Sequence, residues 1–178
     1  MKIKHMKKIL GILVFSLLWS TIGYSNSSER EFLIKFDGIC VQNVDNLKMI
    51  NDFAKVQKWI DLPSEQASMI APRIKGPSYE AYGFRENEIV YLIGINDAEN
   101  KNTCTIASSY NSIDDIISVL KEFYKIELLH KQSQGIQNIK MYKVNLTQSY
   151  NNSGILVLNY SEQTGYKFVS ISVMIDNG

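Results

Sequence analysis

The sequence predicts a single α+β domain, in which one antiparallel sheet of about five or six strands has helices packed on one face. Two observations lead to this fold class. Apolar residues recur at helical spacing in separate stretches, and groups of segments with alternating apolar and polar residues follow them. Because strands and helices occur in runs, the order favours α+β over a parallel α/β fold.

The first helix is predicted within residues 29–42, where two interpretations compete. Phe32, Phe36 and Cys40 have helical spacing, whereas Phe32, Ile34 and Phe36 also alternate as in a strand. The acidic residues at the start of this stretch suit the first turn of a helix, so the helix is favoured.

A second helix is predicted from about residue 45 to residue 58. The residues expected on its apolar face are Leu47, Ile50 and Ala54, with Phe53 as a further candidate. Lysines in its last turn complement the helix dipole. Residues 61–64, with the sequence Asp-Leu-Pro-Ser, are expected to begin a further short helical piece, because proline suits the first turn.

Two groups of three strands, separated by a helix, complete the predicted fold. The first group consists of residues 78–85, 89–95 and 103–109, with a polar loop at 96–102. The second group consists of residues 139–147, 154–160 and 166–175. The intervening helix starts at Ser112, which forms a capping box with Asp115. The last strand alternates strictly, so one of its faces is expected to be buried and the other exposed to water.

Residues 1–25 have the pattern of a secretory signal peptide, which leaves residues 26–178 as the mature domain. A lysine-rich start precedes an apolar run, and small residues follow at the positions that a signal peptidase reads. The apolar run is short for a membrane span, so no stable membrane anchor is expected. The predicted location is the periplasm, with the extracellular space as the alternative.

The charge of the mature chain argues against nucleic acid as a partner. The predicted signal contains four of the 19 basic residues, Lys2, Lys4, Lys7 and Lys8, and none of the 18 acidic residues. The mature chain therefore has 15 basic and 18 acidic residues, a formal net charge of −3. Nucleic-acid recognition needs a basic face, which such a composition does not favour.

Cys40 and Cys104 are the only cysteines, and we expect them to form a disulfide, since an even count in an exported protein indicates a structural bond. The bond would tie the first helix to the third strand and contribute about 4 kcal/mol by closing a long loop. A redox pair would usually form a Cys-x-x-Cys motif, and two thiols with one histidine make a poor zinc site. No metal or cofactor is therefore predicted.

No catalytic residue is assigned from the sequence, although two sets of side chains offer candidates. His130, placed just after a predicted helix, could act as a general base, but such a histidine is more often a solvated linker residue. Glu80 and Glu86 could flank a cleft as the paired acids of glycosidases do, but exposed strand acids are far commoner.

Tyrosines on or beside the predicted strands form the candidate recognition surface. Its members are Tyr79, Tyr82, Tyr160 and Tyr166. Tyrosine offers contact area together with a polar tip, so an exposed cluster can bind a partner. The alternative is that these side chains fill the sheet, where their β-propensity also places them.

Three segments resemble a largely uncharacterised group of small exported proteins of Gram-negative bacteria. They are Phe36-Asp37-Gly38-Ile39-Cys40, Trp59-Ile60-Asp61-Leu62-Pro63 and Cys104-Thr105-Ile106. The resemblance implies a periplasmic α+β domain with one disulfide, and it carries no catalytic residues.

Together these observations predict an exported soluble binding protein. Its partner is expected to be a periplasmic or envelope protein, and one version is an inhibitor or immunity protein that blocks a toxin or hydrolase. Two alternatives stay open: an envelope hydrolase that uses carboxylates such as Glu80, and a small-molecule carrier with an apolar cleft.

Overall fold

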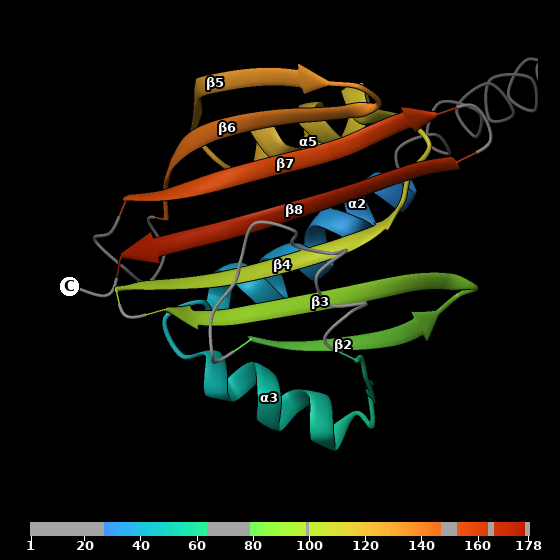
Figure 1. Ribbon diagram of the computed structural model, residues 1–178, viewed down its shortest axis with the longest axis vertical. Helices are drawn as coiled ribbons and strands as arrows, with labels where there is room; N and C mark the ends of the chain where they lie inside the picture. Colours follow the sequence, from blue (N-terminus) through green and yellow to red (C-terminus); the bar gives the residue numbers. More distant parts are fainter. Residues whose placement is uncertain (1–26, 64–78, 99, 147–152, 164–165, 177–178) are drawn as a thin grey trace, which may run out of the picture.

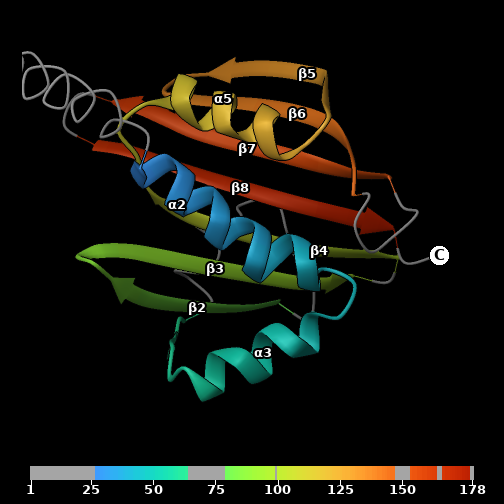
Figure 2. The ribbon, with the colours of Figure 1, turned by 180° about the vertical axis from the view of Figure 1, so that it is seen from behind.

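The computed structural model describes residues 27–63, 79–98, 100–146, 153–163 and 166–176, so the predicted signal peptide at 1–25 lies outside the described residues. The fold is a single α+β domain, as expected. Eight strands form one open antiparallel sheet in the order β1-β2-β3-β4-β8-β7-β6-β5. The helices Ser27–Lys35 and Ile113–Phe123 lie over one face of it, and the helix Leu47–Val56 lies beside the β2 end of the sheet (Figures 1 and 2). None of the described helices is long and apolar enough to cross a membrane.

The elements follow one another in the order helices, strands, helix, strands. The strands are β1 (Ile60–Asp61), β2 (Tyr79–Glu86), β3 (Ile89–Ala98), β4 (Lys101–Ser109), β5 (Ile126–Gln134), β6 (Gln137–Asn145), β7 (Ser153–Gln163) and β8 (Tyr166–Asp176). The helices are α2 (Ser27–Lys35), α3 (Leu47–Val56) and α5 (Ile113–Phe123). A π-helical turn η1 (Phe36–Cys40) and a 3₁₀ turn η2 (Val41–Asn43) continue α2.

The prediction of five or six strands was wrong, because two strands carry little sequence signal. Strand β1 has two residues, and Asp61 lies in it rather than at the start of a helical piece. Strand β5 is exposed along almost its whole length, and a bulge between Leu128 and His130 breaks its alternation. His130 therefore lies in a strand, not in a linker after a helix.

The predicted polar loop at 96–102 is also shorter than expected. Strand β3 continues to Ala98 and β4 begins at Lys101, with Asn96 paired to Thr103. Asn96 of β3 and Thr103 of β4 are both buried. Neither strand is at an edge of the sheet, since β3 lies between β2 and β4, and β4 lies between β3 and β8. Polar residues within a strand pattern were thus mistaken for a turn.

Strand β8 lies at the centre of the sheet, between β4 and β7. Val169, Ile171 and Val173 are fully buried on the side of the helices, as the alternation predicts. The opposite side is not simply exposed: Thr105 of β4 is fully buried there, and its hydroxyl lies 2.7 Å from that of Ser172. Thr105 and Ser172 lie in the two central strands, so side chains of neighbouring strands flank them on both sides.

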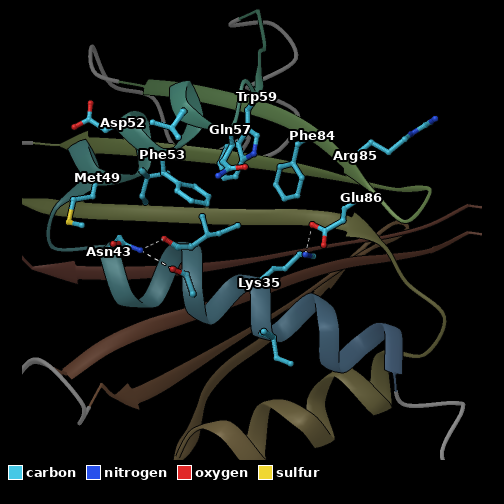
Figure 3. A pocket seen from close by; sticks show the side chains of 15 residues that line it. Lys35, Asn43, Met49, Asp52, Phe53, Gln57, Trp59, Phe84, Arg85 and Glu86 are labelled. Atoms are coloured by element: carbon cyan, nitrogen blue, oxygen red, sulfur yellow. Dashed lines mark hydrogen bonds and ion pairs between the residues drawn. The ribbon is translucent and has the colours of Figure 1, made fainter.

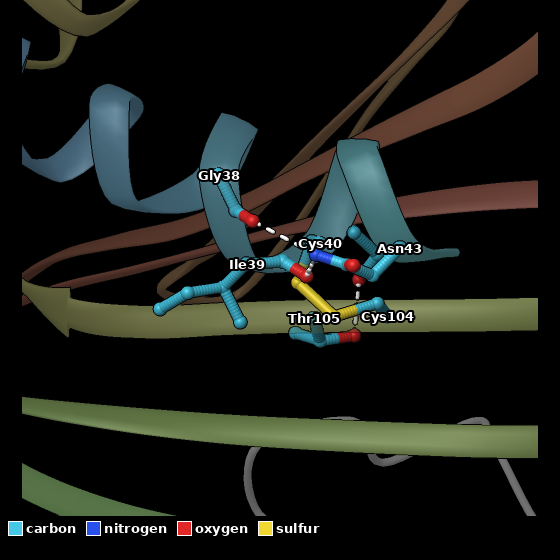
Figure 4. Close-up of a disulfide and its surroundings, with 7 residues drawn as sticks. Gly38, Ile39, Cys40, Asn43, Cys104 and Thr105 are labelled. Carbon is cyan, nitrogen blue, oxygen red and sulfur yellow. Dashed lines mark hydrogen bonds between the residues drawn. A yellow bond between two sulfur atoms is a disulfide. The ribbon is translucent and has the colours of Figure 1, made fainter. Parts of the chain in front are cut away.

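The disulfide between Cys40 and Cys104 is present, with the two Cα atoms 5.2 Å apart, and both residues are fully buried (Figure 4). It ties η1 to β4, as the sequence predicts. The Asn43 side chain donates from Nδ2 to the carbonyl oxygens of Gly38 (2.9 Å) and Ile39 (3.1 Å). These contacts fix the helical turn that ends the first helical segment over the sheet.

A buried carboxylate joins the two helices that cover the sheet. Glu29 of α2 is 2% exposed, and its Oε1 accepts hydrogen bonds from the backbone N–H groups of Asn111 (3.0 Å) and Ser112 (3.2 Å). The Ser112 hydroxyl accepts from the Asp115 N–H, so the predicted cap of α5 is confirmed. Glu29 thus satisfies backbone donors at the start of α5 and docks α2 beside it.

Candidate functional site

The predicted tyrosine surface is not assembled among the described side chains. Tyr79 lies on the face of the sheet away from the helices, with its hydroxyl over Gly94. Tyr82 and Tyr160 lie on the helix side in strands from opposite halves of the sheet, and both are buried. The side chain of Tyr166 lies outside the described part of the structure.

Tyr82 has a structural role that explains its position. Its hydroxyl lies 2.9 Å from both Asn51 Oδ1 and Glu80 Oε2 and can donate its proton to either. Burial raises its pKa, and the Glu80 carboxylate raises it further. Tyr82 therefore links β2 to α3, which carries Asn51.

The two strand carboxylates, Glu80 and Glu86, do not face one another. Both lie on β2, six residues apart, which corresponds to about 20 Å along a strand. Paired acids of glycosidases are separated by about 5–10 Å. Glu86 also forms an ion pair with Lys35 at 2.7 Å. This pair of carboxylates cannot act together on one glycosidic bond.

The structure instead reveals a groove between the first helical segment and α3, which we call the α2–α3 groove (Figure 3). Its volume is about 860 Å³, and residues from α2, η1, α3 and the end of β2 line it. Four of its apolar side chains are unusually exposed for their type: Ile34 (55%), Met49 (55%), Phe53 (47%) and Val56 (74%). Contiguous exposed apolar surface of this kind marks a binding surface more often than a passive one.

Helix α3 forms one wall of the groove and is apolar on two adjacent faces. Leu47, Ile50 and Ala54 are buried in the core, as the sequence predicts. Met49, Phe53 and Val56, at spacings of four and three residues, form a second stripe that lines the groove. Phe53, the further candidate for the buried face, is 47% exposed, so the apolar arc of α3 is wider than the core needs.

The opposite wall comes from α2 and η1. Ile34 and Ile39 line the groove, with Gly38 between them. A Cβ atom at Gly38 would meet no other heavy atom within 4 Å, so this wall has open space beside it. The disulfide at Cys40 and the Asn43 hydrogen bonds hold the backbone of this wall in place.

Stacked aromatic rings extend from α3 across the end of the groove. The rings of Trp59 and Phe84 stack at 4.6 Å between centroids, and Phe53 meets Trp59 edge-on at 5.3 Å. Phe84 in turn stacks on the buried Tyr91 at 5.1 Å. The aromatic chain connects the exposed stripe of α3 to the core, and it makes Trp59 a reporter of the groove.

The charged side chains that line the groove balance one another: Lys35 and Arg85 are positive, and Asp52 and Glu86 are negative. On the α3 wall the charged lining residue is Asp52, whereas Lys48, Lys55 and Lys58 are exposed but do not line the groove. On the other side, the Lys35 ammonium lies between Glu86 (2.7 Å) and Glu31 (3.8 Å), a cluster with one excess negative charge. Arg85 also borders the groove, but its side chain extends away from it (Figure 3).

Comparison with family models, with curated proteins and with solved structures finds no match to this chain. The site therefore has to be interpreted from its own geometry. Within the described residues no group of three or more His, Cys, Asp or Glu side chains is arranged to hold a metal ion. A sequence signal for the groove did exist: the spacing of Met49, Phe53 and Val56 on a helix whose core face was already filled.

Proposed function

We propose that this protein is an exported binding protein that receives the apolar side chains of a protein partner in the α2–α3 groove. The observation that carries the proposal is the second apolar stripe of α3, with Met49, Phe53 and Val56 about half exposed or more. Burying such side chains contributes about 1.5–3 kcal/mol each, which is enough for a few anchors to dominate an interface.

The partner that we propose belongs to the periplasm or the envelope, because the signal peptide predicted at residues 1–25 would carry the groove there. An inhibitor or immunity protein is a specific version of this function. It needs a rigid surface rather than reacting groups, and the disulfide together with the Asn43 hydrogen bonds supports rigidity of one wall.

A second candidate is a carrier of a small apolar molecule. The observation in its favour is the volume of about 860 Å³, which lies within the range of about 300–1,000 Å³ that is common for ligand sites. The two functions use the same groove and differ in what fills it.

Site-directed photocrosslinking tests the proposal. A photoreactive benzoylphenylalanine replaces Phe53 in one variant and Leu129, an exposed residue on the distant β5, in the control. We expect a discrete protein adduct from position 53 that is absent from position 129 and is weakened when Gly38→Leu places a side chain in the groove.

Adducts of equal yield from both positions, or none from position 53, would contradict a protein-binding groove. An adduct of position 53 with a small lipid or metabolite, detected by mass spectrometry, would establish the carrier instead. Thermal melting of each variant provides the control for folding, because Gly38 has open space and Leu129 is exposed.

A further inference from the structure

We infer that the hairpin of β5 and β6 docks reversibly, through its lysines and exposed leucines, on a bilayer surface that contains anionic phospholipids. This hairpin lies at the opposite end of the sheet from β2 and α3, so the inference goes beyond the proposed function and does not depend on what fills the groove (Figure 1). Three observations support it: the charge of the hairpin, like charges placed side by side, and exposed apolar side chains among them.

Positive charge is concentrated on this hairpin. Four lysines and one acid occur within residues 125–145: Lys125, Lys131, Lys140, Lys143 and Glu127. The formal net charge of this stretch is therefore +3, whereas the rest of the mature chain, with 11 basic and 17 acidic residues, has a net charge of −6. A molecule polarised in this way turns its basic end toward an anionic surface.

The lysines are arranged at a cost to the hairpin itself. Lys131 and Lys140 lie directly opposite each other in the two strands, where like charges are destabilising. None of the ion pairs between described side chains involves Lys131, Lys140 or Lys143. Protection of an edge strand accounts for Lys131, but β6 is an inner strand, paired with β7 on its other side. The lysines of β6 are instead explained by a negatively charged partner.

Exposed apolar side chains lie among these lysines. Leu128, Leu129 and Ile136 are each more than half exposed. The register places Leu128 on the same face of the hairpin as Lys131 and Lys140, while Leu129 belongs to the bulge and Ile136 to the turn between the strands. This combination fits the interface of a bilayer, where ammonium groups meet lipid phosphates and apolar side chains enter the acyl boundary.

A lipid surface fits the hairpin better than an acidic protein does. Lys140 and Lys143 are three residues apart in β6 and therefore lie on opposite faces, and β5 is exposed along almost its whole length. A layer of headgroups that meets the edge of the sheet can reach lysines on both faces. The predicted signal peptide would bring the hairpin to such a surface. Each lysine near an anionic surface strengthens binding by about fivefold, so a few lysines give reversible docking rather than a permanent anchor.

Sedimentation with lipid vesicles tests the inference. The mature, oxidised protein is mixed with vesicles of phosphatidylglycerol and phosphatidylcholine in equal amounts, and with vesicles of phosphatidylcholine alone. Lys131→Gln combined with Lys143→Gln removes two lysines of the hairpin. Lys48→Gln combined with Lys55→Gln removes two lysines of α3 and is the control with the same net charge. All four lysines are exposed, and urea denaturation verifies that both variants fold.

We expect saturable binding to the phosphatidylglycerol vesicles and little binding to phosphatidylcholine alone. The hairpin variant should bind about twentyfold more weakly, from about fivefold for each lysine, whereas the α3 control should change by less than about twofold. Binding should weaken in about 0.5 M salt, because exposed charges are then screened. Leu128→Ser combined with Leu129→Ser should weaken binding by about tenfold, and this loss should persist at high salt, since apolar burial is not screened.

Three results would overturn the inference. The first is equal binding to both kinds of vesicle, and the second is an equal loss for the hairpin variant and the α3 control, which would make the effect one of net charge. The third is capture of an acidic protein that depends on Lys131 and Lys143, with no binding to vesicles, which would make the partner a protein. None of these results changes the status of the groove, because the crosslinking at position 53 tests it separately.

Discussion

Removal of the Glu29 carboxylate should loosen the contact between α2 and α5. Glu29→Ala leaves the Asn111 and Ser112 backbone N–H groups, now 3.0 and 3.2 Å from Oε1, without their acceptor. An unsatisfied donor costs about 1–3 kcal/mol, and these two are partly buried, so we expect a loss of about 2–4 kcal/mol in the free energy of unfolding. Glu29→Gln keeps an oxygen acceptor but loses the charge, and should cost about 1 kcal/mol.

The stability contributed by the Glu29 carboxylate should depend on pH, and the surroundings of Glu29 determine the direction. Burial alone would raise its pKa, but hydrogen bonds from Ser28 and from the two backbone N–H groups outweigh it, and the pKa is lowered below the ordinary value of 4.5. The unfolded chain therefore binds the proton more readily than the folded protein. The contribution of the carboxylate is complete above about pH 4.5 and is lost as the pH falls through the lower, folded-state pKa.

Urea denaturation followed by circular dichroism at pH 7 and at successively lower pH measures this contribution. The difference between wild type and Glu29→Gln should shrink below about pH 4.5, and the carboxylates common to both proteins cancel. Glu122→Ala is a matched control, because Glu122 pairs with Arg30 between the same two helices but is exposed, and it should cost less than about 1 kcal/mol. A Glu29→Ala variant as stable as wild type, or a pH-independent difference for Gln, would refute the argument.

Three further outcomes are expected in urea denaturation. Replacing both cysteines by alanine should lower the free energy of unfolding by about 4 kcal/mol or more, because the disulfide closes a loop between residues 64 positions apart. A loss under about 1 kcal/mol would contradict this. Gly154→Ala should lower the free energy of unfolding by about 1–3 kcal/mol, because the new Cβ atom would lie 3.1 Å from the Met174 carbonyl oxygen. Gly38→Ala has free space and should be neutral or stabilising. Equal effects of the two substitutions would be inconsistent with the packing. Tyr82→Phe should cost about 1 kcal/mol through the lost hydrogen bond to Asn51 or Glu80, and a neutral result would mean that this bond adds nothing.

Much of the fold could be predicted, because in several elements the local sequence preference and the pattern of buried residues indicate the same structure. The Ser112 cap, the core stripe of α3 and the alternating β8 each carry a pattern that only one structure satisfies. Strand β5 could not be predicted in the same way, because an edge strand with no buried face has no alternation to preserve, and its bulge shifts the register.

The groove escaped sequence analysis for a different reason. A helical pattern shows which residues are apolar, but not how much of the apolar arc the core covers. Phe53 has the spacing of a further core residue of α3, whereas it is 47% exposed and lines the groove. Tyr82 and Tyr160 do not share an exposed surface, because both are buried and the strands that carry them lie in opposite halves of the sheet.

The most direct test of a groove-binding function is methyl NMR of the mature protein with ¹³C-labelled methionine, titrated with an 18-residue capped peptide that carries leucines along one helical stripe. Met49 lies in the groove, while Met141 and Met174 lie in β6 and β8 of the other half of the sheet and serve as internal controls. We predict that the Met49 methyl signal shifts with saturation and that the signals of Met141 and Met174 do not. An unmoved Met49 signal at saturating peptide, or larger shifts at Met141 or Met174, would contradict the assignment of the α2–α3 groove as the binding site.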